Sequence, residues 1–130
     1  MFTVLYRDNY NRKSGCSGER CGKHPGVDIA VASGTPVVAS MSGKVYRVNY
    51  CNPSWGGLIV IEADNPYEVG KKAYISYAHL SSVYLSEDLS TPIYVTQGQI
   101  IGESGGHPTN DNCPGYSDGS HLHFQIDKQH

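Results

Sequence analysis

The chain has 130 residues and a formal net charge of -2 at pH 7, with 38% hydrophobic residues and 15 glycines. This length suits a single domain, residues 1–130, with one hydrophobic core. The composition lacks the clustered basic excess of nucleic-acid-binding proteins, and no run approaches the ~18 apolar residues of a membrane span. We therefore predict one globular domain that neither binds nucleic acid nor crosses a membrane. A monomer is also expected.

Short alternating or β-branched stretches separated by turn residues predict an antiparallel, all-β fold. In chain order, strands are expected at residues 1–5, 27–31, 37–39, 44–50, 58–62, 73–80, 94–95, 99–102 and 119–126. A short helical turn is expected within 83–89, and long polar loops at 7–23 and 103–120. Loops of this length often carry function, so we expect them to flank a site.

The four cysteines lie in loop-like surroundings and permit three disulfide pairings. We favour Cys16 with Cys21, closing a short loop, and Cys51 with Cys113, joining two distant loops. Such pairing predicts an oxidising location: secreted, periplasmic or cell-wall associated. Two alternatives stay open, namely free thiols and a metal site at Cys21-x-x-His24, although no second pair of that kind completes the latter.

The stretch 119–126 alternates polar and apolar residues and places two histidines on one side of a strand. His121 and His123 share a face, while Leu122, Phe124 and Ile126 are expected to pack into the core. The two histidine backbones lie about 6.6 Å apart in a strand that rises about 3.3 Å per residue. This spacing suits one metal ion, or a metal and an acid/base group; the alternative is a half-buried strand with exposed histidines.

A second informative stretch is His24-Pro25-Gly26-Val27-Asp28. Pro followed by Gly is typical of a type II turn, in which Gly accepts a positive φ. The turn would bring His24 over the strand that starts near Val27, so that imidazole and carboxylate share one centre. Alone the stretch would be an ordinary exposed turn. With the histidine pair it predicts a zinc site that keeps an open position for water.

His79 lies near the end of the expected strand 73–80, within Tyr-Ala-His-Leu-Ser. Beside a zinc-bound water this imidazole could accept or donate the proton that hydrolysis requires. On its own it would more simply be structural or exposed. The sequence contains no His-Glu-x-x-His helix, so histidines are better base candidates than its glutamates.

Together, His24-x-x-x-Asp28, His79 and His121-x-His123 in Ser-His-Leu-His-Phe resemble the lysostaphin/LytM-type zinc metallopeptidases, which cut bacterial peptidoglycan. The resemblance covers roughly residues 24–127, including 26–30, 34–37, 43–45 and 98–102. It implies an antiparallel β-sheet with a loop-walled active-site groove, similar to a duplicated hybrid motif. It also implies peptidoglycan peptides as substrate, either stem peptides or cross-bridges.

The resemblance further implies a role for each residue of the site. His24, Asp28 and His123 would bind zinc, while His79 and His121 would be the catalytic pair that orients or deprotonates water and stabilises the oxyanion. Which of that pair is the base stays open. Two other functions compete with this one: a non-catalytic wall-binding or regulatory domain on the same fold, and a phosphocarrier on a related fold. Asp28 disfavours the phosphocarrier, because a carboxylate repels phosphate.

Overall fold

A computed structural model describes residues 3–5, 26–106, 113 and 119–128. These residues contain no helix, and therefore none long and apolar enough to cross a membrane. They form a nine-stranded sheet in which every pairing is antiparallel. The strands are β1 (Thr3–Leu5), β2 (Val27–Ala30), β3 (Pro36–Val38), β4 (Gly43–Asn52), β5 (Gly56–Asp64), β6 (Lys72–Val83), β7 (Tyr94–Val95), β8 (Ile100–Ser104) and β9 (Leu122–Asp127).

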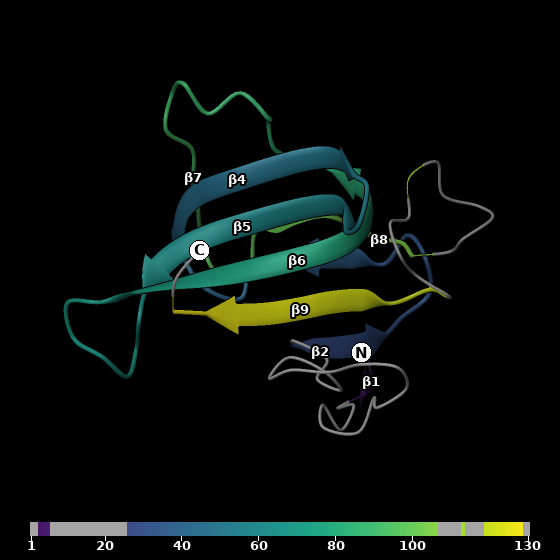
Figure 1. The fold of residues 1–130 in the computed structure, drawn as a ribbon, viewed down its shortest axis with the longest axis horizontal. Helices are drawn as coiled ribbons and strands as arrows, with labels where there is room; N and C mark the ends of the chain where they lie inside the picture. The colour runs from purple at the N-terminus through teal and green to yellow at the C-terminus, as the bar shows by residue number, and fades with distance from the viewer. Residues whose placement is uncertain (1–2, 6–25, 107–112, 114–118, 129–130) are drawn as a thin grey trace, which may run out of the picture.

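The main path of the sheet runs β1-β2-β9-β6-β5-β4-β7, and β8 joins β3 to β6 off this path. Figure 1 shows β4, β5, β6, β9 and β2 side by side. The predicted antiparallel all-β class is therefore confirmed. The strand β6 changes partner along its length, pairing with β9 through Ala78 and with β8 from Leu80 onward. The sheet thus divides at the intervening residue, His79.

One face of the sheet packs into the main hydrophobic core. Ile59 and Ile61 of β5 and Ile75 of β6 are fully buried there, against Ile101 of β8. The opposite face carries a smaller cluster formed by Leu58, Val60 and Ala78, with Trp55 and Tyr74 packed against it. Since β5 is buried on both faces, its prediction as a central strand is confirmed.

Tyr77 anchors β6 in the main core and directly precedes Ala78, which belongs to the smaller cluster. Its ring is buried and meets Phe124 of β9 edge-on, at 5.5 Å between centroids. The Ser40 backbone N–H donates to the Tyr77 hydroxyl oxygen at 2.8 Å. Burial raises the pKa of Tyr77 above its usual value, and the hydrogen bonds with Ser40 oppose that rise. The backbone that leads to His79 is therefore fixed by packing and by hydrogen bonding.

Two details differ from the sequence-based prediction. The helical turn expected within 83–89 is wrong: β6 runs to Val83, and bends follow. Ser86 Oγ accepts from the Asp88 N–H, and Asp88 Oδ1 accepts from the Ser90 N–H, so side chains take the hydrogen bonds that a helix would use. The last strand begins at Leu122 instead of residue 119, and Ile126 is 58% exposed instead of buried.

The predicted disulfide between Cys51 and Cys113 is confirmed, with a Cα–Cα distance of 5.6 Å. It joins the end of β4 to the connection between β8 and β9. Cys16 and Cys21 lie outside the described residues, so their pairing stays a prediction. Within the described part of the chain this is the one disulfide, and it ties Cys113 to β4.

Replacing both residues, Cys51→Ser with Cys113→Ser, is expected to lower the free energy of unfolding by about 2–4 kcal/mol. The disulfide spans a sequence separation of 62, so its loss releases a long loop in the unfolded chain. Urea denaturation of the double variant and the wild type, both without reductant, checks this. Equal denaturation midpoints and slopes would show that the link stabilises nothing.

Candidate metal and catalytic site

The site residues gather where the sheet divides. Asp28 of β2 lies directly opposite His123 of β9, and His123 lies opposite Ala78 of β6. His79 follows at the division itself, and His121 pairs with Gly105 in an isolated bridge just before β9. Strands from both ends of the chain thus bring a carboxylate and three imidazoles together.

Asp28 and His123 form the buried centre of this group. They are 6% and 2% exposed, and Oδ1 of Asp28 lies 3.2 Å from Nδ1 of His123. Two ligand atoms of a tetrahedral zinc ion with bonds of about 2.0–2.1 Å lie about 3.3–3.4 Å apart. The spacing of this pair therefore fits neighbouring positions around one such ion.

His121 also lies near the Asp28 carboxylate. Its Nδ1–H donates to the Gly119 carbonyl oxygen at 2.8 Å, because a carbonyl can only accept. In the neutral imidazole Nε2 is then unprotonated, and this atom lies 3.7 Å from Oδ1 of Asp28. His121 therefore directs a proton-accepting nitrogen toward the centre.

His79 reaches this face because of a β-bulge. Gly57 pairs with Leu80 and Ile59 with Tyr77, which leaves one extra residue on β6 between the two pairs. In a regular strand His79 would point toward the main core, one position after Ala78, which faces the smaller cluster. The extra residue and the positive φ of His79, 60°, change that direction. A left-handed conformation at a residue other than glycine is strained and is often found at functional sites.

The His79 ring then lies beside the other site rings. Its centroid is 4.8 Å from that of His121 and 6.3 Å from that of His123, and the side chain is 3% exposed. The backbone N–H of His79 donates to the Trp55 carbonyl at 2.6 Å, which holds the bulge in place. The imidazoles of His79 and His121 are thus near enough to act on one reacting group.

Trp55 is a site residue that the sequence reasoning missed. Its ring centroid lies 4.9 Å from that of His123 and 5.8 Å from that of His79. This packing shields the imidazoles and limits their rotation. A signal was present in the sequence, since Trp55 is the only tryptophan and precedes Gly56-Gly57, where a close backbone approach is typical.

The predicted turn before β2 is described from Gly26 onward. Gly26 has a φ of 86°, so the positive φ expected at this glycine is confirmed. A Cβ atom there would lie 2.5 Å from the Phe124 carbonyl oxygen and 3.1 Å from His123 Nε2. His24, the third predicted zinc ligand, lies outside the described residues and stays a prediction.

Gly26→Ala is expected to destabilise the protein by about 2–4 kcal/mol, combining a strained positive φ with overpacking against β9. Gly98→Ala is a matched control, because Gly98 has a φ of 87° with nothing within 4 Å of its Cβ position. The control should lose only about 1 kcal/mol. Urea denaturation of both variants measures the difference, and equal losses would contradict close packing of this turn on β9.

The described residues alone do not complete a metal site. Among them, no group of three or more His, Cys, Asp or Glu side chains is arranged to hold a metal ion. Asp28 and His123 nevertheless fit zinc chemistry, which favours imidazole and carboxylate donors. A third donor would have to come from elsewhere, and the predicted turn places His24 two residues before Gly26.

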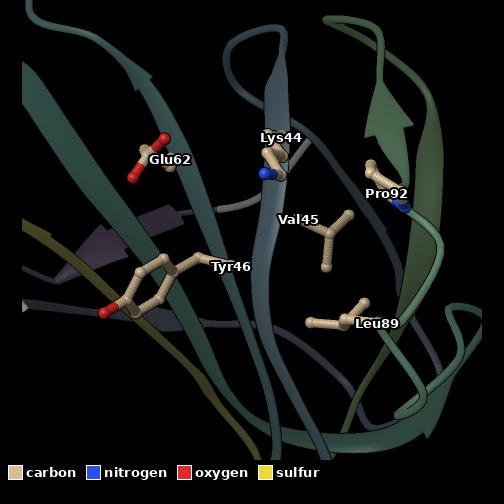
Figure 2. A pocket seen from close by; sticks show the side chains of 6 residues that line it. All are labelled: Lys44, Val45, Tyr46, Glu62, Leu89 and Pro92. Carbon is tan, nitrogen blue, oxygen red and sulfur yellow. The ribbon is translucent and has the colours of Figure 1, made fainter.

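A hollow of about 270 Å³ lies elsewhere on the molecule, between β4 and the connection that precedes β7 (Figure 2). Its lining contains no histidine or aspartate. Lys44 and Glu62 occupy paired positions on neighbouring strands, and neither is a site residue. The hollow is lined by Lys44, Val45, Tyr46, Glu62, Leu89 and Pro92.

The antiparallel sheet thus carries a buried carboxylate–imidazole pair of the kind that binds zinc in proteins. Residues 22–130 match Peptidase family M23, and the chain belongs to this family. The catalytic domain of the antimicrobial peptidase lysostaphin from Staphylococcus simulans superposes with a TM-score of 0.67 at 33% identity, covering 96% of this chain and 79% of that one. A zinc-containing peptidase from Vibrio cholerae superposes with a TM-score of 0.70 at 28% identity, covering 96% of this chain and 33% of that one.

Curated relatives agree with the structural comparison. Lysostaphin is 36% identical over an alignment of 128 residues that covers 95% of this chain and 22% of lysostaphin. The peptidoglycan DD-endopeptidase ShyA from Vibrio cholerae is 32% identical over 108 residues, which are 83% of this chain and 21% of ShyA. The chain thus spans about a fifth of the length of these two curated relatives.

Proposed function

We propose that the chain is a zinc-dependent endopeptidase that hydrolyses peptide bonds in the stem peptides or cross-bridges of bacterial peptidoglycan. The observation that carries the proposal is the 3.2 Å approach of Asp28 Oδ1 to His123 Nδ1, with two further imidazoles beside it. Membership of peptidase family M23 supports the reaction type. Relatives described as a peptidoglycan endopeptidase and as an antimicrobial peptidase support the substrate class.

In this proposal His24, Asp28 and His123 hold the zinc ion. The bound ion would polarise the scissile carbonyl and lower the pKa of a water molecule. Asp28 contributes a negative charge, and its burial between imidazoles limits competition from bulk water. The ring of Trp55 packs on that of His123, with the centroids 4.9 Å apart, and limits its movement.

In this proposal His121 and His79 transfer the proton and stabilise the charge that develops on the substrate. His121 presents Nε2 toward the centre and is the proton acceptor in this arrangement, because its Nδ1–H is held by the Gly119 carbonyl. The ring centroid of His79 lies 4.8 Å from that of His121, which supports a role for His79 as the hydrogen-bond donor to the developing oxyanion. The bulge at His79 thus brings a second imidazole beside His121, so that one histidine can accept the proton while the other stabilises the oxyanion.

The disulfide between Cys51 and Cys113 is consistent with action outside the cytoplasm, where disulfides persist. We therefore propose that the chain acts as a secreted, periplasmic or wall-associated monomer on peptidoglycan peptides. The described residues contain no helix that could cross a membrane.

Digestion of several peptidoglycan types, followed by mass spectrometry of the fragments, tests the proposal. We expect new amino termini at one kind of peptide bond, dependent on zinc and lost in His123→Ala. Wild-type protein that carries one equivalent of zinc but cuts no peptidoglycan would contradict it. That result would instead favour a non-catalytic wall-binding or regulatory role.

A further inference from the structure

Three polar side chains follow one another along β9, on the face that points away from the main core. His123, Gln125 and Asp127 are spaced two residues apart, so they project from the same side of the strand. Nε2 of His123 lies 2.9 Å from Oε1 of Gln125, and Nε2 of Gln125 donates to Oδ2 of Asp127 at 2.7 Å. The row connects the buried imidazole to a carboxylate near the end of the strand.

The carboxylate of Asp127 determines which way the Gln125 amide faces. An ionised carboxylate only accepts hydrogen bonds, so the amide nitrogen of Gln125 must face Asp127. The amide oxygen then faces His123 and can only accept. The atom that donates in the 2.9 Å contact is therefore Nε2–H of His123.

This hydrogen bond fixes the tautomer of a neutral His123. With the proton on Nε2, the lone pair is on Nδ1, the atom that lies 3.2 Å from Oδ1 of Asp28. A metal-binding histidine commonly donates its other N–H to a carboxylate, carbonyl or water, which orients the ring and makes the ligand more basic. Here an amide oxygen occupies the position of that acceptor.

We propose that Gln125, oriented by Asp127, is a positioning residue that holds His123 in the tautomer and orientation that bind zinc through Nδ1. The proposal rests on the zinc site of the proposed function. It extends the site from its ligands to the row along β9. Gln125 touches neither substrate nor the reacting atoms.

Zinc affinity, measured by chelator competition at pH 8, tests the proposal in the full chain without an activity assay. Gln125→Met keeps the length of the side chain and removes both hydrogen bonds, so zinc binding should weaken about 10–100-fold. Gln97→Met is the matched control, because Gln97 is an exposed residue in a turn outside the site and should leave affinity unchanged.

A double variant, Gln125→Glu with Asp127→Asn, tests the direction of the hydrogen bonds. The new carboxylate would accept from His123 and the new amide would donate to that carboxylate, with no change in net charge. Affinity should return to within about threefold of wild type, on the same reasoning. Packing alone does not predict this recovery.

Nitrogen-15 NMR of the zinc-loaded wild type gives a readout that needs no variant. We expect zinc on Nδ1 of His123 and a proton on Nε2. Zinc on Nε2, a Gln125→Met affinity within twofold of wild type, or no recovery in the double variant would each overturn the proposal. If the wild type binds no zinc, the proposed function fails as well. If the wild type binds zinc tightly and Gln125→Met binds it equally tightly, only the positioning role of Gln125 is removed.

Discussion

Asp28→Ala is expected to abolish peptidase activity and to reduce zinc affinity below about 1% of the wild-type value. Loss of a group that only supports a ligand costs about 10–100-fold in affinity, and loss of a ligand should exceed this. Asp28 is also the carboxylate that the structure places against both His121 and His123. Zinc content by elemental analysis and release of amino termini from peptidoglycan measure the two effects.

Asp64→Ala is the matched control for this variant. Asp64 is an exposed β5 residue whose carboxylate pairs with Lys72, and the ammonium group lowers the pKa of that carboxyl. Exposed pairs of this kind contribute at most about 1 kcal/mol, so the control should keep both zinc and activity. Full zinc binding by Asp28→Ala would remove Asp28 from the ligand set.

The second large effect is expected for His121→Ala. This variant should retain one equivalent of zinc while kcat falls about 10²–10⁴-fold, the usual contribution of a general acid or base. The reason is geometric: Nε2 of His121 is 3.7 Å from Asp28 Oδ1, longer than the 3.2 Å of the Asp28–His123 pair. We therefore expect His121 to act on water or substrate and not to bind the ion.

Zinc titration and steady-state kinetics on the same preparation separate these roles. His79→Ala should also keep zinc and lose kcat, because its ring contacts His121. Loss of zinc in His121→Ala, to the degree seen in Asp28→Ala, would make His121 a ligand and would contradict the assigned pair.

Much of the fold was predictable because periodicity and turn chemistry are local. The alternation in 44–50 and the β-branched run 58–62 predicted β4 and β5, and Gly26 was expected to need the positive φ that it has. The Cys51–Cys113 pairing was also predicted correctly. The erroneous helical turn arose where Ser86 and Asp88 bond to nearby backbone, a competition that hydrophobic spacing does not reveal.

The arrangement within the site was less accessible from the sequence. Strand alternation alone would direct His79 toward the core, and the bulge opposite Gly57 depends on pairing between β5 and β6. The contact of Trp55 with two imidazoles likewise depends on tertiary packing. The row from His123 to Asp127 lies along one strand, but its hydrogen-bond directions follow only from side-chain geometry.

A crystal structure of the zinc-loaded protein, with anomalous data collected on both sides of the zinc absorption edge, tests the central claim most directly. We predict one anomalous peak within about 2.0–2.2 Å of a carboxylate oxygen of Asp28 and of Nδ1 of His123. His24 should supply the third ligand, with the rings of His79 and His121 outside bonding distance. A peak bound by His79 or His121, or no peak beside Asp28, would contradict the account.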